Sequence, residues 1–127
     1  MVRFERARCL EIAGTCLLFG VRRASRAVTQ LYEAELAPAG LQATQLSVLV
    51  AAAARRGWTM SDLASALGMD RTTLTRNVEP LRRTKLLRIG AGRDRRTRSV
   101  NLTPKGHRAL GEAYPLWKRT QRRMLSS

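Results

Sequence analysis

"TMSDLASALGMDRTTLTRNVEPL", residues 59–81, decides the fold of this chain. Thr59 is a favoured helix N-cap, and Asp62 three residues later approximates a capping box, so a short helix begins here. Gly68 supplies the turn that ends this helix, and Asp70 caps the helix that follows. A short helix, a tight turn with glycine and a second helix form the helix-turn-helix pattern.

The second helix of this pair has one apolar stripe and an unusually polar outer face. Leu74, Val78 and Leu81 recur at helical spacing and predict the buried side. The residues between them are rich in threonine, a weaker helix former than the Ala, Glu and Lys of an ordinary solvated helix. The alternative is a solvated amphipathic helix in a helical bundle. In a helix-turn-helix, however, the N-terminal part of the second helix enters the major groove of DNA, where arginine bonds guanine and threonine offers a hydroxyl and a methyl group. The candidate DNA-binding residues of this recognition helix are Arg71, Thr72, Thr73, Thr75 and Arg76.

A basic β-hairpin is predicted directly after this motif. Short strands are expected at residues 86–89 and 99–102, with the glycine-containing tip "GAGRDRRT" between them. Several arginines at one tip repel one another unless a partner neutralises them, which favours a DNA-binding wing over a solvated surface hairpin. Such a wing reaches the minor groove or the phosphates beside it. Its candidate DNA-binding residues are Arg93, Asp94, Arg95, Arg96 and Arg98.

The charge balance points to the same kind of partner. The 127 residues include 24 Lys and Arg against 9 Asp and Glu, which gives a net charge of +15. Such an excess destabilises the compact state through self-repulsion and is most easily understood if a polyanion neutralises it. Nucleic acid is the leading candidate, and an anionic membrane surface is the second.

Nothing in the sequence favours the membrane. No stretch reaches the apolar length of a membrane span. The apolar segment at residues 9–21 is interrupted by Glu11 and is followed by "RRASR" where a signal peptide would have a small-residue cleavage site. We therefore expect a cytoplasmic protein with no membrane partner.

The expected fold class is mainly α with a small β-hairpin wing, as a single winged-helix domain over residues 1–127. The long N-terminal helix has an apolar side made by Ile12, Cys16, Phe19, Val28 and Leu31. The expected elements are an N-terminal helix at 5–36, a second helix at 42–56, the helix-turn-helix at 59–83, the wing at 86–102 and a C-terminal helix at 103–125.

No group of residues predicts catalysis, a metal site or a cofactor. His107 is the only histidine, and the acidic residues are scattered with no close pair for acid–base work. No Cys/His cluster has metal-ligand spacing. "GAG" at residues 90–92 is followed by no helix and so does not form a phosphate-binding loop. We expect a protein that is not an enzyme.

Cys9 and Cys16 are the candidate redox residues. Two cysteines fit a reducing compartment. In one continuous helix, seven residues would place their α-carbons about 10.5 Å apart, too far for a disulfide. Arg6 and Arg8 make Cys9 the better candidate, but the favoured interpretation is that both cysteines are small buried apolar residues.

The ordered motifs resemble the MarR family of bacterial transcription regulators. The helix-turn-helix carries part of the likeness, and "DRRTRSVNLTPKG" at residues 94–106 carries the rest. That segment matches the wing pattern D-x-R and then L-T-x-x-G at Asp94, Arg96, Leu102, Thr103 and Gly106. The resemblance covers roughly residues 15–125.

This resemblance implies a winged-helix homodimer, joined through its N- and C-terminal helices, that binds palindromic operators in double-stranded DNA. It further implies a repressor that responds to a small aromatic ligand or an oxidant. Arg96 would be the wing arginine held in position by Asp94, and residues 71–83 would be the recognition helix. The alternative function is a sequence-independent nucleic-acid-binding protein, architectural or RNA-associated, that uses the same charge.

The sequence departs from the family pattern in more than one place, including Pro80 inside the recognition helix. Lys85 stands where the family usually has glycine, at the left-handed turn that ends the recognition helix. If that backbone is kept, a lysine there costs on the order of 1 kcal/mol.

Overall fold

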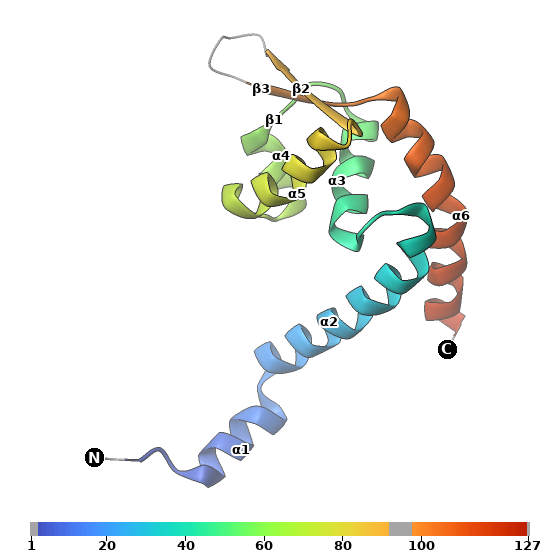
Figure 1. The fold of residues 1–127 in the computed structure, drawn as a ribbon. Helices are drawn as coiled ribbons and strands as arrows, with labels where there is room; N and C mark the ends of the chain where they lie inside the picture. Colours follow the sequence, from blue (N-terminus) through green and yellow to red (C-terminus); the bar gives the residue numbers. More distant parts are fainter. Residues whose placement is uncertain (1–2, 92–97, 127) are drawn as a thin grey trace.

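A computed structural model describes residues 3–91 and 98–126. The first helices are α1 (Arg6–Thr15) and α2 (Leu17–Leu36), followed by a short 3-10 turn, η1 (Ala37–Ala39), and by α3 (Ala43–Ala54). Figure 1 shows that the C-terminal end of α2 lies beside α6, while α1 extends away from the rest of the chain. The remaining elements are β1 (Trp58–Thr59), α4 (Met60–Leu67), α5 (Arg71–Arg83), β2 (Leu87–Ala91), β3 (Arg98–Leu102) and α6 (Pro104–Ser126).

The apolar stripes predicted from helical spacing meet in one core. Leu74, Val78 and Leu81 of α5 are all buried, and they pack with Leu49 of α3 and Leu63 of α4. Full burial of such a side chain stabilises the fold by about 1.5–3 kcal/mol. The core therefore fixes which side of α5 faces inward and, by default, which side faces solvent.

Local hydrogen bonds fix the α4–α5 turn as the sequence predicts. The Asp62 N–H donates to Thr59 Oγ1 at the start of α4 (3.0 Å), and the Thr73 N–H donates to Asp70 Oδ1 at the start of α5 (2.7 Å). Gly68 has φ +66°, the left-handed conformation that ends α4. The two caps and the left-handed glycine together define the turn between the two helices.

The wing belongs to a three-stranded antiparallel sheet with the order β1-β3-β2. β2 and β3 pair in the register Leu87 with Leu102 and Ala91 with Arg98. β2 thus covers residues 87–91, shifted from the predicted 86–89. β1 was not predicted, because two residues are too short for a recognisable alternation; it adds Trp58 and Thr59 to the far side of β3.

The N-terminal helix predicted at 5–36 is not continuous, which corrects the sequence interpretation. Cys16 has φ −66° and ψ 119° and separates α1 from α2. Two features weaken the helix here. Gly14, Thr15 and Cys16 are consecutive weak helix formers, and the Thr15 hydroxyl donates to the Glu11 carbonyl (2.6 Å), a bond that often bends helices.

Polar contacts join the end of α2 to the C-terminal half of α6. Tyr32 donates its hydroxyl proton to Gln121 Oε1. Glu35 forms ion pairs with Arg119 (3.6 Å) and Arg123 (2.8 Å). The two helices predicted to mediate dimerisation are thus tied to each other within one chain.

Within the described residues, no single helix is long and apolar enough to cross a membrane. By length and composition alone, one pair would pass that test together, namely 17–39 with 43–54, which are bent by 69° relative to each other.

Candidate nucleic-acid interface

The exposed face of α5 carries every residue that the sequence predicts for its DNA contact. Leu74, Val78 and Leu81 are at most 2% exposed and hold the helix against the core. Because helical residues three and four apart share a face, these three form one buried stripe; Thr72 and Arg76 lie opposite it, and Arg71, Thr73 and Thr75 lie at its flanks. The predicted contact residues, all exposed, are Arg71, Thr72, Thr73, Thr75 and Arg76.

Arg71 and Thr75 are two of these residues whose side chains have partners within the protein. Arg71 Nη1 donates to Ser61 Oγ of α4 (2.9 Å), so this guanidinium lies across the gap between the two helices of the motif. The Thr75 hydroxyl donates to the Arg71 carbonyl (2.8 Å), which leaves its oxygen free to accept and its methyl group exposed. Ser61 is a site residue that the sequence reasoning missed. Its place in the first turn of α4 was the available signal, but the pairing with Arg71 depends on the angle between the helices.

The start of α5 is fixed electrostatically as well as by packing. The backbone N–H of Thr73, helped by its hydroxyl, holds the pKa of the Asp70 carboxyl below its ordinary value. The ionised carboxylate also lies at the positive end of the helix dipole. At the other end, a hydrogen bond from Arg82 lowers the pKa of Glu79 (2.6 Å between Nη2 and Oε1). Both acids are therefore charged at neutral pH.

The end of α5 has the strained geometry that the sequence predicts. Lys85 has φ +64°, and no other described non-glycine residue has a positive φ. The Leu86 N–H donates to the Leu81 carbonyl (2.9 Å) and the Lys85 N–H to the Arg82 carbonyl (3.0 Å). This is the Schellman pattern, in which the left-handed residue is normally glycine.

Only part of the predicted wing falls within the described residues. Arg98 is exposed at the open end of the β2–β3 ladder, opposite Ala91. It lies on a strand that is held to β1 as well as to β2. Arg93, Asp94, Arg95 and Arg96 lie outside the described residues.

The two cysteines are not both buried, which corrects another interpretation. Cys9 is exposed on α1, and Cys16 is half-buried at the joint between α1 and α2. The helix ends only after the Cys16 α-carbon, because the Cys16 N–H still donates to the Ile12 carbonyl (2.9 Å), so the separation expected for a continuous helix still applies to this pair. Among residues 3–91 and 98–126, no group of three His, Cys, Asp or Glu side chains is placed to hold a metal ion.

Two neighbouring cavities lie between α3 and α6 and share Ala53 in their walls. One, of about 450 Å³, is apolar and includes Val50, Tyr114 and Trp117. The other, of about 340 Å³, is lined by three basic side chains, namely Arg56 after α3, Arg88 of β2 and His107 of α6. An apolar floor beside a basic end suits a ligand that has an apolar body and an anionic group.

Comparison with solved structures identifies the relatives of this chain. No family model matches it, and no curated protein matches it. MosR, a transcriptional regulator of M. tuberculosis crystallised in complex with DNA, is 43% identical with a TM-score of 0.84 over 89% of this chain and 83% of that chain.

Two further structures share the fold at lower identity. A MarR-family regulator from Rhodococcus sp. RHA1 is 24% identical with a TM-score of 0.75, over 84% of this chain and 76% of that chain. CouR from Rhodococcus jostii RHA1, bound to p-coumaroyl-CoA, is 23% identical with a TM-score of 0.72, over 84% and 75%. The helix-turn-helix, the sheet behind it and the identity to MosR agree: this chain belongs to the MarR family of transcriptional regulators.

Proposed function

We propose that this protein is a sequence-specific regulator that inserts α5 into the major groove of duplex DNA. The observation that carries the proposal is the exposed face of α5. Buried Leu74, Val78 and Leu81 hold this helix against the core. Its exposed side chains are those of Arg71, Thr72, Thr73, Thr75 and Arg76. Arginine and threonine at these positions suit guanine edges and thymine methyl groups. The complex of the related MosR with DNA supports the same partner.

The wing supplies the second part of the proposed interface. We assign Arg93, Arg95, Arg96 and Arg98 to phosphate or minor-groove contacts and Asp94 to the positioning of Arg96. Such contacts fix the register of the protein on DNA without reading major-groove bases. The support is the family wing pattern in the sequence and the placement of Arg98 at the open end of the hairpin.

We further propose a homodimer on a palindromic operator. α1 and the first half of α2 leave apolar side chains in solvent, including Leu10 (61%), Leu17 (80%) and Phe19 (47%). On α6, Leu125 is also exposed. Exposed apolar surface of this extent marks a protein interface. A second copy of the same chain would cover it and place two recognition helices on half-sites about 10 base pairs apart.

An effector site fits the paired cavities at Ala53. A small aromatic acid would stack its ring near Tyr114 and Trp117 and direct its carboxylate to Arg56, Arg88 and His107. CouR, whose structure holds an aromatic thioester ligand, gives a precedent within this fold. We propose that the protein is a cytoplasmic repressor with no catalytic activity and that binding of such an effector releases it from DNA. Cys9 is the better candidate if an oxidant acts instead.

Selection of duplexes from a random pool tests the main proposal. We expect a palindrome to emerge, bound at least about a thousandfold more tightly than random duplex. Arg76→Ala should relax the base preference by about 1–3 kcal/mol at one position of each half-site. The matched control is Arg83→Ala, an exposed arginine at the other end of the same helix. Binding without any sequence preference would favour the sequence-independent alternative.

A further inference from the structure

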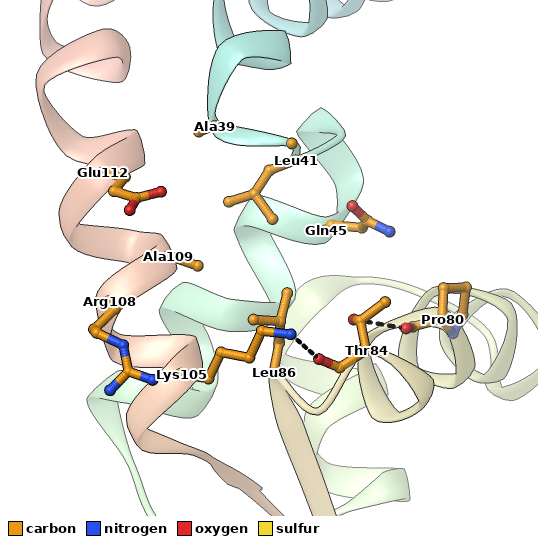
Figure 2. A pocket seen from close by; sticks show the side chains of 11 residues that line it. Ala39, Leu41, Gln45, Pro80, Thr84, Leu86, Lys105, Arg108, Ala109 and Glu112 are labelled. Carbon is orange, nitrogen blue, oxygen red and sulfur yellow. Dashed lines mark hydrogen bonds between the residues drawn. The ribbon is translucent and has the colours of Figure 1, made fainter.

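A third cavity, of about 470 Å³, lies where α5 ends and α6 begins. Figure 2 shows its walls, which come from the segment around Leu41, from the end of α5 with Leu86, and from the first turns of α6. It shares no lining residue with the cavities at Ala53. Its volume falls within the range of small-molecule sites.

The charges of this cavity are ordered along α6. Lys105 and Arg108 lie at one end, and Glu112 lies about 6 Å further along the helix axis, four residues at 1.5 Å each. Within residues 3–91 and 98–126, the side chains of Arg108 and Glu112 have no hydrogen-bond or ion-pair partner. Leu41 and Leu86 supply apolar surface between these groups and the opposite wall. The cavity thus offers two cations, an apolar middle and one carboxylate.

Lys105 connects the cavity to the recognition helix. Its Nζ donates to the carbonyl oxygen of Thr84 (2.8 Å), the residue that ends α5. Of the two dashed lines in Figure 2, the one between Lys105 and Thr84 marks this contact. The next residue is the strained Lys85, whose own carbonyl accepts from the Thr103 hydroxyl (2.6 Å). Lys105 therefore places a positive charge at the negative end of the α5 dipole.

We propose that this cavity binds a small carboxylate with an amino or hydroxyl group at its far end. The carboxylate accepts from Arg108 and Lys105, the short apolar spacer lies along Leu41 and Leu86, and the far group donates to Glu112. A carboxylate is a stronger acceptor for an ammonium group than an amide carbonyl. Binding draws Lys105 away from Thr84 and loosens the end of α5. This consequence, unlike the binding itself, rests on the proposed DNA contact of α5.

Calorimetric titration of the full chain with 5-aminovalerate tests the site. We expect binding that is lost with 5-aminovaleramide, which lacks the carboxylate, and weakened with valerate, which lacks the amine.

Arg108→Gln should weaken binding of 5-aminovalerate about tenfold, the usual effect of losing a hydrogen bond to a charged group. Arg122→Gln, an exposed arginine of α6 away from the cavity, is the matched control and should change nothing. No binding of 5-aminovalerate or 5-hydroxyvalerate, or equal binding by Arg108→Gln, would overturn the proposal. Equal urea midpoints for the variants show that each is folded.

Operator affinity tests the coupling separately. Saturating 5-aminovalerate should weaken binding of the selected operator several-fold in the unmodified protein and leave Arg108→Gln unaffected. Lys105→Gln should weaken operator binding without any ligand. An unchanged operator affinity in saturated protein would overturn the coupling. If the protein bound no duplex specifically while the titration still depended on Arg108, the proposed function would fail and the site would stand.

Discussion

Lys85 is a single residue on which the geometry of the recognition helix depends. It has the left-handed backbone that suits glycine, yet it keeps the chain turning from α5 into β2. Lys85→Gly should stabilise the protein by about 1 kcal/mol, because the steric penalty of the β-carbon is removed. Urea unfolding gives the measurement. Thr84→Gly, one residue earlier at φ −85°, is the control and should lose stability instead.

Asp70 makes the stability of the motif depend on pH. Its pKa is lowered in the folded state by the Thr73 N–H, so the ionised carboxylate contributes stability above its unfolded pKa of about 3.9. That contribution is lost as the pH falls through the lower folded value. Asp70→Asn keeps a capping oxygen but no charge. The stability difference between the two proteins should be constant near neutral pH and shrink below about pH 4. A difference that stayed constant throughout acid titration would contradict the assignment.

At the scale of elements, α6 packs closely against the base of the wing at Gly106. A β-carbon there would lie 2.4 Å from the Leu86 carbonyl oxygen and 2.5 Å from Leu102 Cδ1. Gly106→Ala should therefore destabilise the protein by about 1–3 kcal/mol, as overpacking does. Gly111→Ala, in the same helix with no atom within 4 Å, should be stabilising by about 0.5–1 kcal/mol. Thermal unfolding of both variants compares them. Equal effects would mean that α6 does not press on Leu86 and Leu102.

The elements also show which features a sequence can predict. The α4–α5 pair was predictable because caps, a left-handed glycine and a helical stripe act within a few residues of one another. The left-handed turn at Lys85 was predictable from its position in the family pattern. The break at Cys16 was not predicted, because weak helix formers such as Gly14 do not by themselves end a helix and the Thr15 hydroxyl bond is visible only in three dimensions.

The candidate site also combines features that the sequence predicts with features that it does not. Burial of Leu74, Val78 and Leu81 follows from their spacing, so the exposed face of α5 could be predicted from the sequence. The bond between Arg71 and Ser61 joins two helices, and the cavities join α3, α5 and α6. Such features depend on how the elements pack, which no local pattern encodes.

At the scale of the whole molecule, the charge of +15 sets the behaviour toward DNA. Several Lys and Arg contacts to phosphate release counterions on binding, so affinity should fall about a hundredfold between about 50 and about 200 mM salt, as expected for four phosphate contacts. Fluorescence anisotropy with the selected operator measures the slope of log affinity against log salt. A slope near zero would mean that the charge serves another purpose.

The small sheet behind the recognition helix has one further consequence, which concerns aggregation. An unpaired strand edge is a template on which strands of other molecules assemble into fibres, and short, charged edges oppose this. Within the described residues, β2 is paired on one side only, is five residues long and carries an exposed Arg88 at its second position. β1 leaves the other edge only two residues long. The sheet that supports the wing is thus too short and too positively charged to propagate from one copy to the next, even where many copies crowd together.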